Sequence, residues 1–295
     1  MDELFGIPLP LLFGQLLLGL INGAFYAMLS LGLAVIFGLL NVINFTHGAQ
    51  FMMGAFAAWM LLEYFGINYW LSLILVPIII GATGIVLEKL MISRLYKLDH
   101  LYGLLLTFGI GLVIEGVFRN EFGSSGLPYR IPPELSGAWD LGFMFMPVYR
   151  GWVVVFAAFV CLATWLVIEK TSLGANLRAA TENPALVQAF GINVPRMVTL
   201  TYGAGVALAA LGGVLAAPIY SVNPQMGTNL IIVVFAVVVI GGMGSILGSV
   251  ITGFGLGIVE GLTKVFWPEA SATVIFVIMI IVLLARPAGL FGRTA

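Results

Sequence analysis

The chain consists of long apolar runs that are almost free of charged side chains, and this pattern constrains its fold more than any other feature. Charges and clusters of glycine, proline and asparagine separate nine runs, at 10–38, 42–63, 69–91, 101–118, 151–168, 197–217, 228–243, 247–267 and 270–285. A helix that crosses a bilayer needs about 20 such residues. The pattern predicts an all-α transmembrane bundle of about eight or nine crossings, and we expect residues 1–295 to form a single transmembrane domain.

Composition excludes several classes of protein. Of the 295 residues, 61% are apolar and 8% are charged, and the mean hydropathy is +1.12. Soluble domains carry about 25% charged residues, so this chain cannot cover the surface of a cytosolic enzyme and is expected to contact membrane lipid. A net charge of −1 gives no electrostatic attraction for DNA or RNA. One cysteine and two histidines provide neither an internal disulfide nor a Cys or His metal site.

Basic residues gather at three places, which the positive-inside rule assigns to the cytoplasm. They follow the third run (Lys89, Arg94, Lys97), separate the fifth run from the sixth (Lys170, Arg178, Arg196) and end the chain (Arg286, Arg293). An even number of runs separates each place from the next, as the rule requires. The C-terminus and the loop 169–196 are therefore predicted in the cytoplasm. The N-terminus and the loop 119–150 are predicted outside, and this outer loop is either a simple connection or a docking surface.

The first run raises a problem of length. As one straight helix over 9–40 it would span roughly 45 Å, whereas the hydrocarbon core is about 30 Å thick. Three solutions remain open: a strongly tilted helix, a part that lies at the membrane interface, or a break near Asn22–Gly23.

Polar residues interrupt the apolar sequence at 41–50. The candidate solute-path residues in this segment are Asn44, Thr46, His47 and Gln50. We expect Thr46 to cap a helix that starts there and that directs its N-terminal N–H groups and positive dipole end toward a solute near the midplane. Gly48 is a candidate for close helix packing or a helix break. The alternative is a polar loop at the cytoplasmic surface between two crossings, since unpaired polar groups in hydrocarbon cost several kcal/mol each.

A second interruption of the same kind lies at 220–229. Asn-Pro and Gln-Met-Gly break the helix, and Thr228 is expected to cap the next one. Asn223 and Gln225 are weaker candidates for the solute path. The glycines that follow, predicted to allow close packing or a sharp reversal, are Gly241, Gly242, Gly244 and Gly248. A matched pair of interruptions in two halves of a chain is typical of a transporter binding site.

The cytoplasmic segment 177–193 predicts a short helix. Asn183 would cap it, Pro184 would take its first position and Gly191 would end it. Two turns are not stable alone in water, so the helix needs an apolar partner. That partner is either the chain's own crossings or a groove on a soluble subunit. The candidate coupling residues are Arg178, Glu182, Asn183, Pro184, Leu186, Val187, Phe190 and Gly191, with Leu186, Val187 and Phe190 on one side.

Charges inside the apolar runs are few. Glu115 lies late in the fourth run, and Glu260 in the eighth run has Lys264 four residues later, which is the favourable order for a helical pair. This pair is either structural or part of a solute or proton path. Glu88, at the end of a run, is expected to have no special role.

Catalytic motifs are missing from the sequence. It has no GxxxxGK[ST] phosphate loop, no HExxH and no GxSxG, so no catalytic residue is predicted and a membrane enzyme is disfavoured. An ATP-independent carrier or channel remains a rival, although it would need an ion-coupling site and the runs hold no cluster of acids.

Four segments together resemble the branched-chain amino acid ABC permeases of the LivH type. Residues 43–48 (I-N-F-T-H-G) are similar to the I-N-F-A-H-G signature, with Thr46 where alanine is usual. Residues 239–248 resemble the V-x-G-G-x-G-S-x-x-G block, and the segment 178–192 looks like the cytoplasmic coupling loop. Residues 286–292 resemble the R-P-x-G-L-F-G tail. The matches follow the order of the family.

This resemblance implies an importer permease in the bacterial inner membrane, built with discontinuous helices. It implies several partners: a second, LivM-like permease subunit, two cytoplasmic ABC ATPases that hold ATP and Mg²⁺, and an external, periplasmic solute-binding protein. No cofactor is expected in this chain. The implied solute is a small carboxylate-bearing molecule, foremost a branched-chain or related amino acid, with urea, amides and aromatic acids as alternatives. The resemblance also favours the midplane interpretation of 43–50 and the coupling role of 183–191.

Overall fold

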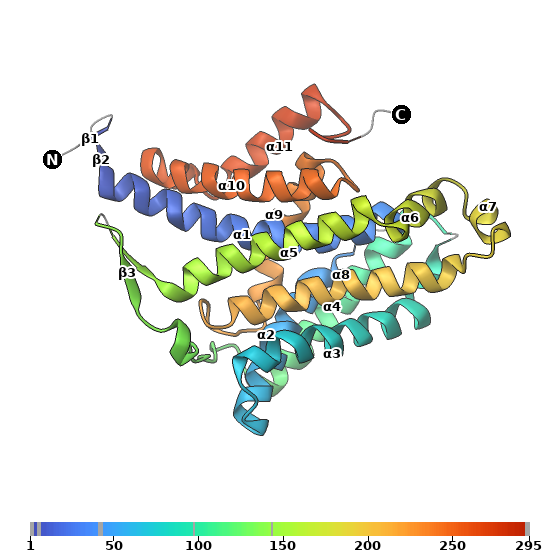
Figure 1. Cartoon of the computed structure of the whole chain (residues 1–295), viewed down its shortest axis with the longest axis horizontal. Helices are drawn as coiled ribbons and strands as arrows, with labels where there is room; N and C mark the ends of the chain where they lie inside the picture. The colour runs from blue at the N-terminus through green and yellow to red at the C-terminus, as the bar shows by residue number, and fades with distance from the viewer. Residues whose placement is uncertain (1–2, 5–6, 41–43, 97, 143, 293–295) are drawn as a thin grey trace. The chain divides into compact units, whose positions relative to one another are not determined.

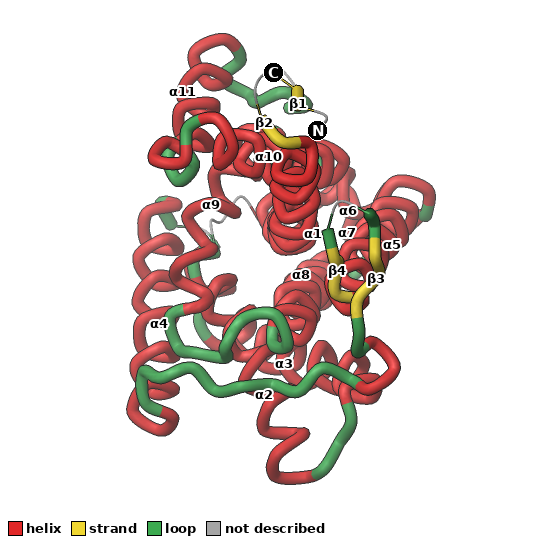
Figure 2. Tube along the Cα trace, turned by 90° about the vertical axis from the view of Figure 1, so that its left-hand side faces the viewer, coloured by secondary structure: helices red, strands yellow, loops and turns green. Residues whose placement is uncertain are grey.

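The structure is a computed structural model that describes residues 3–4, 7–40, 44–96, 98–142 and 144–292. Four residues used in the sequence predictions lie outside this part of the chain, namely Asn41, Ile43, Lys97 and Arg293. Helices dominate the described residues, as Figure 2 shows in red. In order they are α1 (Leu9–Leu40), α2 (Thr46–Phe65), α3 (Tyr69–Leu90), α4 (His100–Phe122), α5 (Val148–Lys170), α6 (Ser172–Glu182), α7 (Pro184–Ala189), α8 (Val194–Ala216), α9 (Met226–Gly241), α10 (Ile246–Phe266) and α11 (Val274–Ala285) (Figure 1).

Each of the nine apolar runs forms one helix, which confirms the prediction of a polytopic helical membrane protein. Among the residues that the structure describes, six helices are long and apolar enough to cross a membrane: α1, α3, α4, α5, α8 and α10. The helix α1 is continuous from Leu9 to Leu40, so the alternative of a break near Asn22–Gly23 is wrong. The helices α9 and α11 have 16 and 12 residues, which at 1.5 Å per residue is less than the thickness of the hydrocarbon core of about 30 Å.

Short strands accompany the helices. In the described residues β1 (Glu3–Leu4) pairs with β2 (Ile7–Pro8), and β3 (Ala138–Asp140) pairs with β4 (Phe145–Pro147), both antiparallel. Three 3₁₀ turns lie at η1 (Ile92–Leu95), η2 (Pro133–Leu135) and η3 (Pro268–Ala270). The predicted outer loop is shorter than 119–150, because α4 continues to Phe122 and α5 begins at Val148. The loop 169–196 is likewise shortened at both ends and contains α6 and α7.

The chain forms two compact units. One comprises residues 1–30, 131–161 and 233–295, and the other comprises 31–130 and 162–232. The helices α1, α5 and α9 each contribute residues to both units. The prediction of one transmembrane domain over 1–295 stays a prediction.

In the first unit, small residues bring α1 and α10 into backbone contact. Gly253, Gly257 and Gly261 recur every four residues and so share one face of α10. A Cβ on Gly19 of α1 would lie 2.5 Å from the Gly257 carbonyl oxygen, so only glycine fits here. Close packing of this kind replaces the hydrophobic driving force that helices lack inside a membrane.

Two of the family-like motifs meet in the same unit. The carbonyl oxygens of Ile240 and Gly241, at the end of α9, accept hydrogen bonds from the N–H groups of Leu290 and Phe291 over 2.8 and 3.1 Å. Gly242 has φ +103, and a Cβ on Gly289 would lie 2.6 Å from its Cα. The C-terminal tail therefore satisfies carbonyl groups that the helix end leaves free.

In the second unit, α8 packs along α2 and α3. The contacts again use small residues: a Cβ on Gly84 of α3 would lie 2.7 Å from the Val206 side chain, and a Cβ on Gly203 would lie 2.5 Å from the Ile85 side chain. The helix α4 packs against α2. The unit therefore holds the described part of the first polar interruption and the segment 177–193 on a shared set of helices.

Candidate functional site

The described part of the first interruption is buried inside the protein. Asn44, Thr46, His47 and Gln50 are each at most 1% exposed. The alternative of a polar surface loop therefore does not hold for residues 44–50. The ring of His47 packs on a glycine, since a Cβ on Gly32 would lie 3.0 Å from its Cε1 atom.

Thr46 does not cap α2, so that prediction is wrong. The helix begins at Thr46, with Phe45 at the N-cap position and no side-chain cap. The Thr46 hydroxyl instead donates to the Thr107 carbonyl oxygen of α4 over 2.7 Å, and the Thr107 hydroxyl accepts from the Phe45 N–H over 3.2 Å. The reason lies in the tertiary structure. The neighbouring helix α4 provides a carbonyl oxygen that accepts from the Thr46 hydroxyl, and its Thr107 hydroxyl oxygen accepts from the backbone N–H of Phe45 at the start of α2.

Tyr202 of α8 joins this cluster, and the sequence analysis missed it. Its side chain is 1% exposed and lies beside Gln50 and Asn44. Asn44 Nδ2 donates to Gln50 Oε1 over 3.3 Å. The Tyr202 hydroxyl lies within hydrogen-bonding reach of both amide side chains, so the three residues form one buried polar cluster. The available signal was one tyrosine in a helix made largely of small residues.

The two interruptions meet through their glycines. A Cβ on Gly48 would lie 2.6 Å from the Gly227 carbonyl oxygen, so the start of α2 crosses the start of α9. The weaker candidates lie apart from the buried cluster: Asn223 is half-buried and Gln225 is exposed. Asn223 Oδ1 accepts from the Gln225 N–H over 3.0 Å, which is an Asx turn.

Thr228 also does not cap its helix. The helix α9 begins at Met226, and the Thr228 hydroxyl donates to Glu115 of α4. Glu115 also pairs with Arg119, one turn later on α4. The intramembrane acid Glu115 is thus neutralised on its own helix and ties that helix to α9.

Glu88 of α3 is 2% exposed, and its environment differs from the expectation of an ordinary helix-end residue. Its two carboxylate oxygens accept from Tyr96 Oη over 2.6 Å and from Thr199 Oγ1 over 2.7 Å. Burial, together with the hydrogen bond and negative charge of Glu88, raises the pKa of Tyr96 above its ordinary value, so the phenol stays a donor. Thr199 lies in the second turn of α8, about one turn before Tyr202.

The segment 177–193 folds into the capped short helix that the sequence predicts. Asn183 Oδ1 accepts from the Leu186 N–H over 3.0 Å, Pro184 takes the first position of α7, and Gly191 has φ +82. Val187 is 6% exposed and packs with Ala180 and Val194.

The three apolar side chains of α7 are not equivalent. Val187 is buried against other residues of the chain, whereas Leu186 is 54% exposed and Phe190 is 78% exposed. Arg178 is engaged internally, since its Nη1 atom donates to the Ile168 carbonyl oxygen over 3.1 Å and to Glu169 over 3.3 Å. Glu182 is exposed at the end of α6. Of the candidate coupling residues, Val187 is buried and Arg178 is half-buried, whereas the others are exposed, namely Glu182, Asn183, Pro184, Leu186, Phe190 and Gly191.

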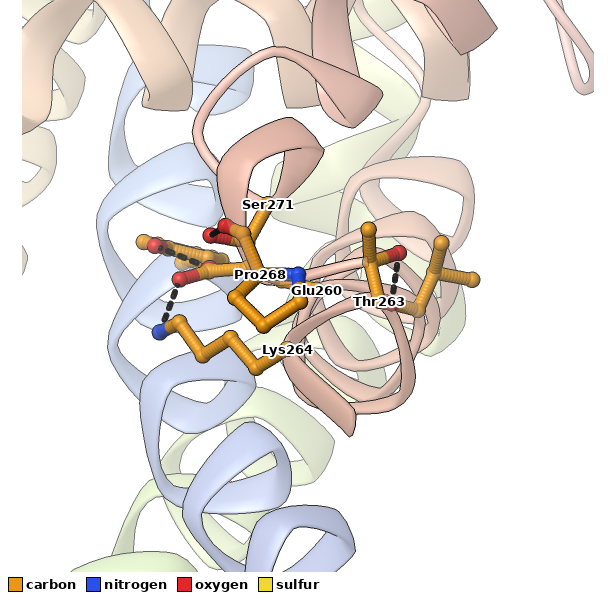
Figure 3. Close-up of polar contacts among 7 residues, drawn as sticks. Glu260, Thr263, Lys264, Pro268 and Ser271 are labelled. Carbon is orange, nitrogen blue, oxygen red and sulfur yellow. Dashed lines mark hydrogen bonds and ion pairs between the residues drawn. The ribbon is translucent and has the colours of Figure 1, made fainter. Parts of the chain in front are cut away.

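The predicted pair of Glu260 and Lys264 is present in the first unit. Lys264 Nζ lies 2.6 Å from Glu260 Oε1 (Figure 3). The Tyr26 hydroxyl of α1 donates to Glu260 Oε2 over 2.7 Å. Both carboxylate oxygens are engaged, which favours the structural interpretation of this pair. The searched part of the chain contains no group of three or more His, Cys, Asp or Glu residues that could hold a metal ion.

Six long apolar helices, short apolar helices with polar breaks, and a capped helix with exposed apolar residues define a polytopic membrane permease. The sequence profile described as "Branched-chain amino acid transport system / permease component" matches residues 15–283. The chain belongs to this family, whose members are transport components and not enzymes.

Individual relatives agree with this assignment. The chain is 30% identical to the high-affinity branched-chain amino acid transport system permease protein LivH of Salmonella typhimurium, over 95% of each chain. It is 29% identical to BraD of Pseudomonas aeruginosa, also over 95% of each chain. It is 26% identical to LivM of Salmonella typhimurium, over 91% of this chain and 68% of LivM.

Proposed function

We propose that the chain is the transmembrane permease subunit of an ABC importer, and that partner ATPases act on it through α7. The exposure of Leu186 and Phe190 beside the anchored Val187 carries this proposal. A helix of six residues would not persist alone in water. The packing of Val187 against the chain's own core holds the helix in place. Its exposed apolar side chains, Leu186 and Phe190, are then available to bind a groove on another protein.

The arrangement of α6, α7 and α8 supports a transmission route. Val187 of α7 packs with Val194 at the start of α8, with Met197 and Val198 beside them. One turn further, Thr199 of α8 is bound to Glu88 of α3. A push on α7 would therefore reach α8 directly, and through α8 the buried cluster beside Tyr202.

The orientation follows from basic residues at helix ends. Lys89, Lys170 and Arg286 lie at the ends of α3, α5 and α11, and the positive-inside rule assigns them to the cytoplasm. The segment with α7 then faces the cytoplasm, where ATPases would lie, and the loop with β3 and β4 faces an external solute-binding protein. The chain itself has no phosphate loop, so ATP and Mg²⁺ would bind in the partner subunits.

We further propose that the solute is a branched-chain or related amino acid. The names of the relatives support this class. Asn44, Thr46, His47 and Gln50 would line the path, with Asn223 and Gln225 near its outer end. A second permease subunit of the LivM kind would complete the pathway, and similarity to LivM itself supports such a homologous pair.

The test is purification of the chain from cells that express its operon, followed by analysis of the proteins that co-elute. We expect two ATPase subunits to be retained by the natural chain and lost from Phe190→Asp. The matched control is Phe65→Asp, since Phe65 is similarly exposed at 73% but ends α2 on the predicted outer side. Absence of ATPases from the natural chain, with ATP-independent uptake in vesicles, would establish the rival carrier instead.

The solute class is tested in vesicles that contain the assembled complex, with ATP inside and the binding protein outside. Radiolabelled leucine, urea, a short amide and an aromatic acid are compared. Uptake of leucine that requires ATP supports the proposal, whereas uptake of urea or of the amide alone would contradict it.

A further inference from the structure

The buried carboxylate of Glu88 joins three elements of the second unit, and this arrangement points beyond a stabilising role. One oxygen accepts from Tyr96 at the end of η1, and the other accepts from Thr199 in the second turn of α8. A carboxylate is costly to bury unless hydrogen bonds compensate its charge. A movement of α8 away from α3 therefore has to replace the bond between Thr199 and Glu88.

The Thr199 hydroxyl has a second acceptor within reach. Its oxygen lies 2.7 Å from Glu88 Oε2 and 3.0 Å from the carbonyl oxygen of Pro195, one turn earlier on α8. A hydroxyl group has a single proton to donate, and a carboxylate oxygen is the stronger of the two acceptors. If α8 moves away from α3, the proton can turn to Pro195, so the bond to Glu88 can open without leaving Thr199 unpaired.

The same bond lies next to the packing that anchors α7. Val187 of α7 is buried against Val194 at the start of α8, and Val198 packs beside them. Val198 directly precedes Thr199 in the chain. A displacement of α7 therefore reaches the bond between Thr199 and Glu88 within one turn of α8.

On its other side, Glu88 lies near the buried polar cluster of Asn44, Gln50 and Tyr202. The Tyr202 hydroxyl interacts electrostatically with Glu88 and lies within hydrogen-bonding reach of both amide side chains. Tyr202 follows Thr199 by about one turn of α8. A shift of Thr199 relative to Glu88 therefore also changes the surroundings of Tyr202.

We propose that Glu88 is a positioning residue that couples the displacement of α7 to the candidate solute path. In the described conformation its carboxylate holds α3, α8 and the end of η1 together. When the ATPases displace α7, the Thr199 hydroxyl moves from Glu88 to the Pro195 carbonyl oxygen, and α8 moves along α3. This proposal rests on the proposed importer function and names the contact through which ATP hydrolysis is coupled to transport.

The test compares leucine uptake with ATP hydrolysis in vesicles that contain the assembled complex, with ATP inside and the binding protein outside. The measured quantity is the amount of leucine taken up per ATP hydrolysed. A loss of stability alone lowers both activities in proportion and leaves this ratio unchanged, because it only reduces the number of intact complexes.

Thr199→Val keeps the size of the side chain and removes its hydroxyl. We expect its ratio to fall about tenfold while ATP hydrolysis continues, a factor typical of one hydrogen bond to a charged group. Thr199→Ser keeps the hydroxyl and is expected to retain the natural ratio.

Thr201→Val is the matched control. Thr201 is similarly buried, but its hydroxyl donates to the Met197 carbonyl oxygen of its own helix, so we expect the natural ratio. A natural ratio in Thr199→Val overturns the proposal, and so does an equal fall in Thr199→Ser or in Thr201→Val.

Glu88→Gln keeps the proposal testable if Thr199→Val does not assemble. The amide can still bind both hydroxyl groups, but it lacks the charge that strengthens these bonds, so its ratio is also expected to fall. A natural ratio in Glu88→Gln overturns the proposal. Since the two residues would act through one bond, the double variant is expected to lose less than the product of the two single losses, and multiplying losses overturn the proposal.

The natural complex separates this proposal from the proposed function. Absence of ATP-dependent leucine uptake by the natural complex would count against the importer function itself. Uptake by the natural complex together with an unchanged ratio in the variants of Thr199 and Glu88 would refute only the coupling role.

Discussion

Gly48 of α2 and Gly227 of α9 meet backbone to backbone, since a Cβ on Gly48 would lie 2.6 Å from the Gly227 carbonyl oxygen. The two residues are far apart in the sequence and lie in the two polar interruptions. Their contact places the buried residues 44–50 against the start of a short helix. The crossing therefore depends on the absence of both side chains.

The first prediction concerns this crossing. Gly48→Ala is expected to destabilise the protein by about 1–3 kcal/mol, because two backbones have to separate. Gly116→Ala on α4 is the control, since nothing lies within 4 Å of a Cβ there, and it is expected to be neutral or slightly stabilising. Thermal unfolding of the purified chains in detergent compares them. Equal midpoints for both variants would mean that the crossing is loose.

The second prediction concerns Glu88. Thr199→Val removes the hydroxyl that donates to the Glu88 carboxylate and is expected to cost about 1.5–3 kcal/mol, as for other hydrogen bonds to charged groups. Thr201→Val is matched in burial, but the Thr201 hydroxyl donates only to the Met197 carbonyl oxygen of its own helix. Denaturant unfolding is expected to separate the two variants, and a cost as large for Thr201→Val would refute the assigned role of Glu88.

The third prediction concerns the cap of α7. Asn183→Ala is expected to cost about 1 kcal/mol, because the Leu186 N–H loses its acceptor. Since α7 is so short, we expect this loss to fray it and to reduce the ATPase activity that solute stimulates in the complex. Asn68→Ala removes an equivalent cap from α3 and is expected to leave stimulation intact. Equal loss in both variants would show a general effect of stability.

The fourth prediction concerns the pair in Figure 3. Lys264→Met removes the cation from the Glu260 carboxylate and is expected to cost about 1–3 kcal/mol, which is less than for a fully buried pair because the Lys264 side chain is 37% exposed. The double variant Lys264→Met with Glu260→Gln is expected to recover most of this loss. The midpoint of thermal unfolding reports both values. No recovery in the double variant, with uptake abolished, would favour a role of Glu260 in a solute or proton path.

The sequence alone determined the features that depend on neighbours along the chain. The nine apolar runs form nine helices, because helix formation and burial in lipid depend on the local periodicity and length of each run. The cap at Asn183, the first-turn proline at 184 and the stop at Gly191 were predicted correctly, because each involves groups within one turn. The pair of Glu260 and Lys264 was predicted for the same reason.

Only the tertiary structure decided which polar groups meet. Thr46 and Thr228 were predicted as caps, but acceptors on α4 engage their hydroxyls instead. The side chains around Tyr202 and Glu88 come from helices that are distant from them in the sequence. A polar side chain takes the partner that packing brings within about 3 Å, and no local pattern states which helix that is. Sequence therefore fixes where the chain can bury polar groups, whereas packing fixes what each of them binds.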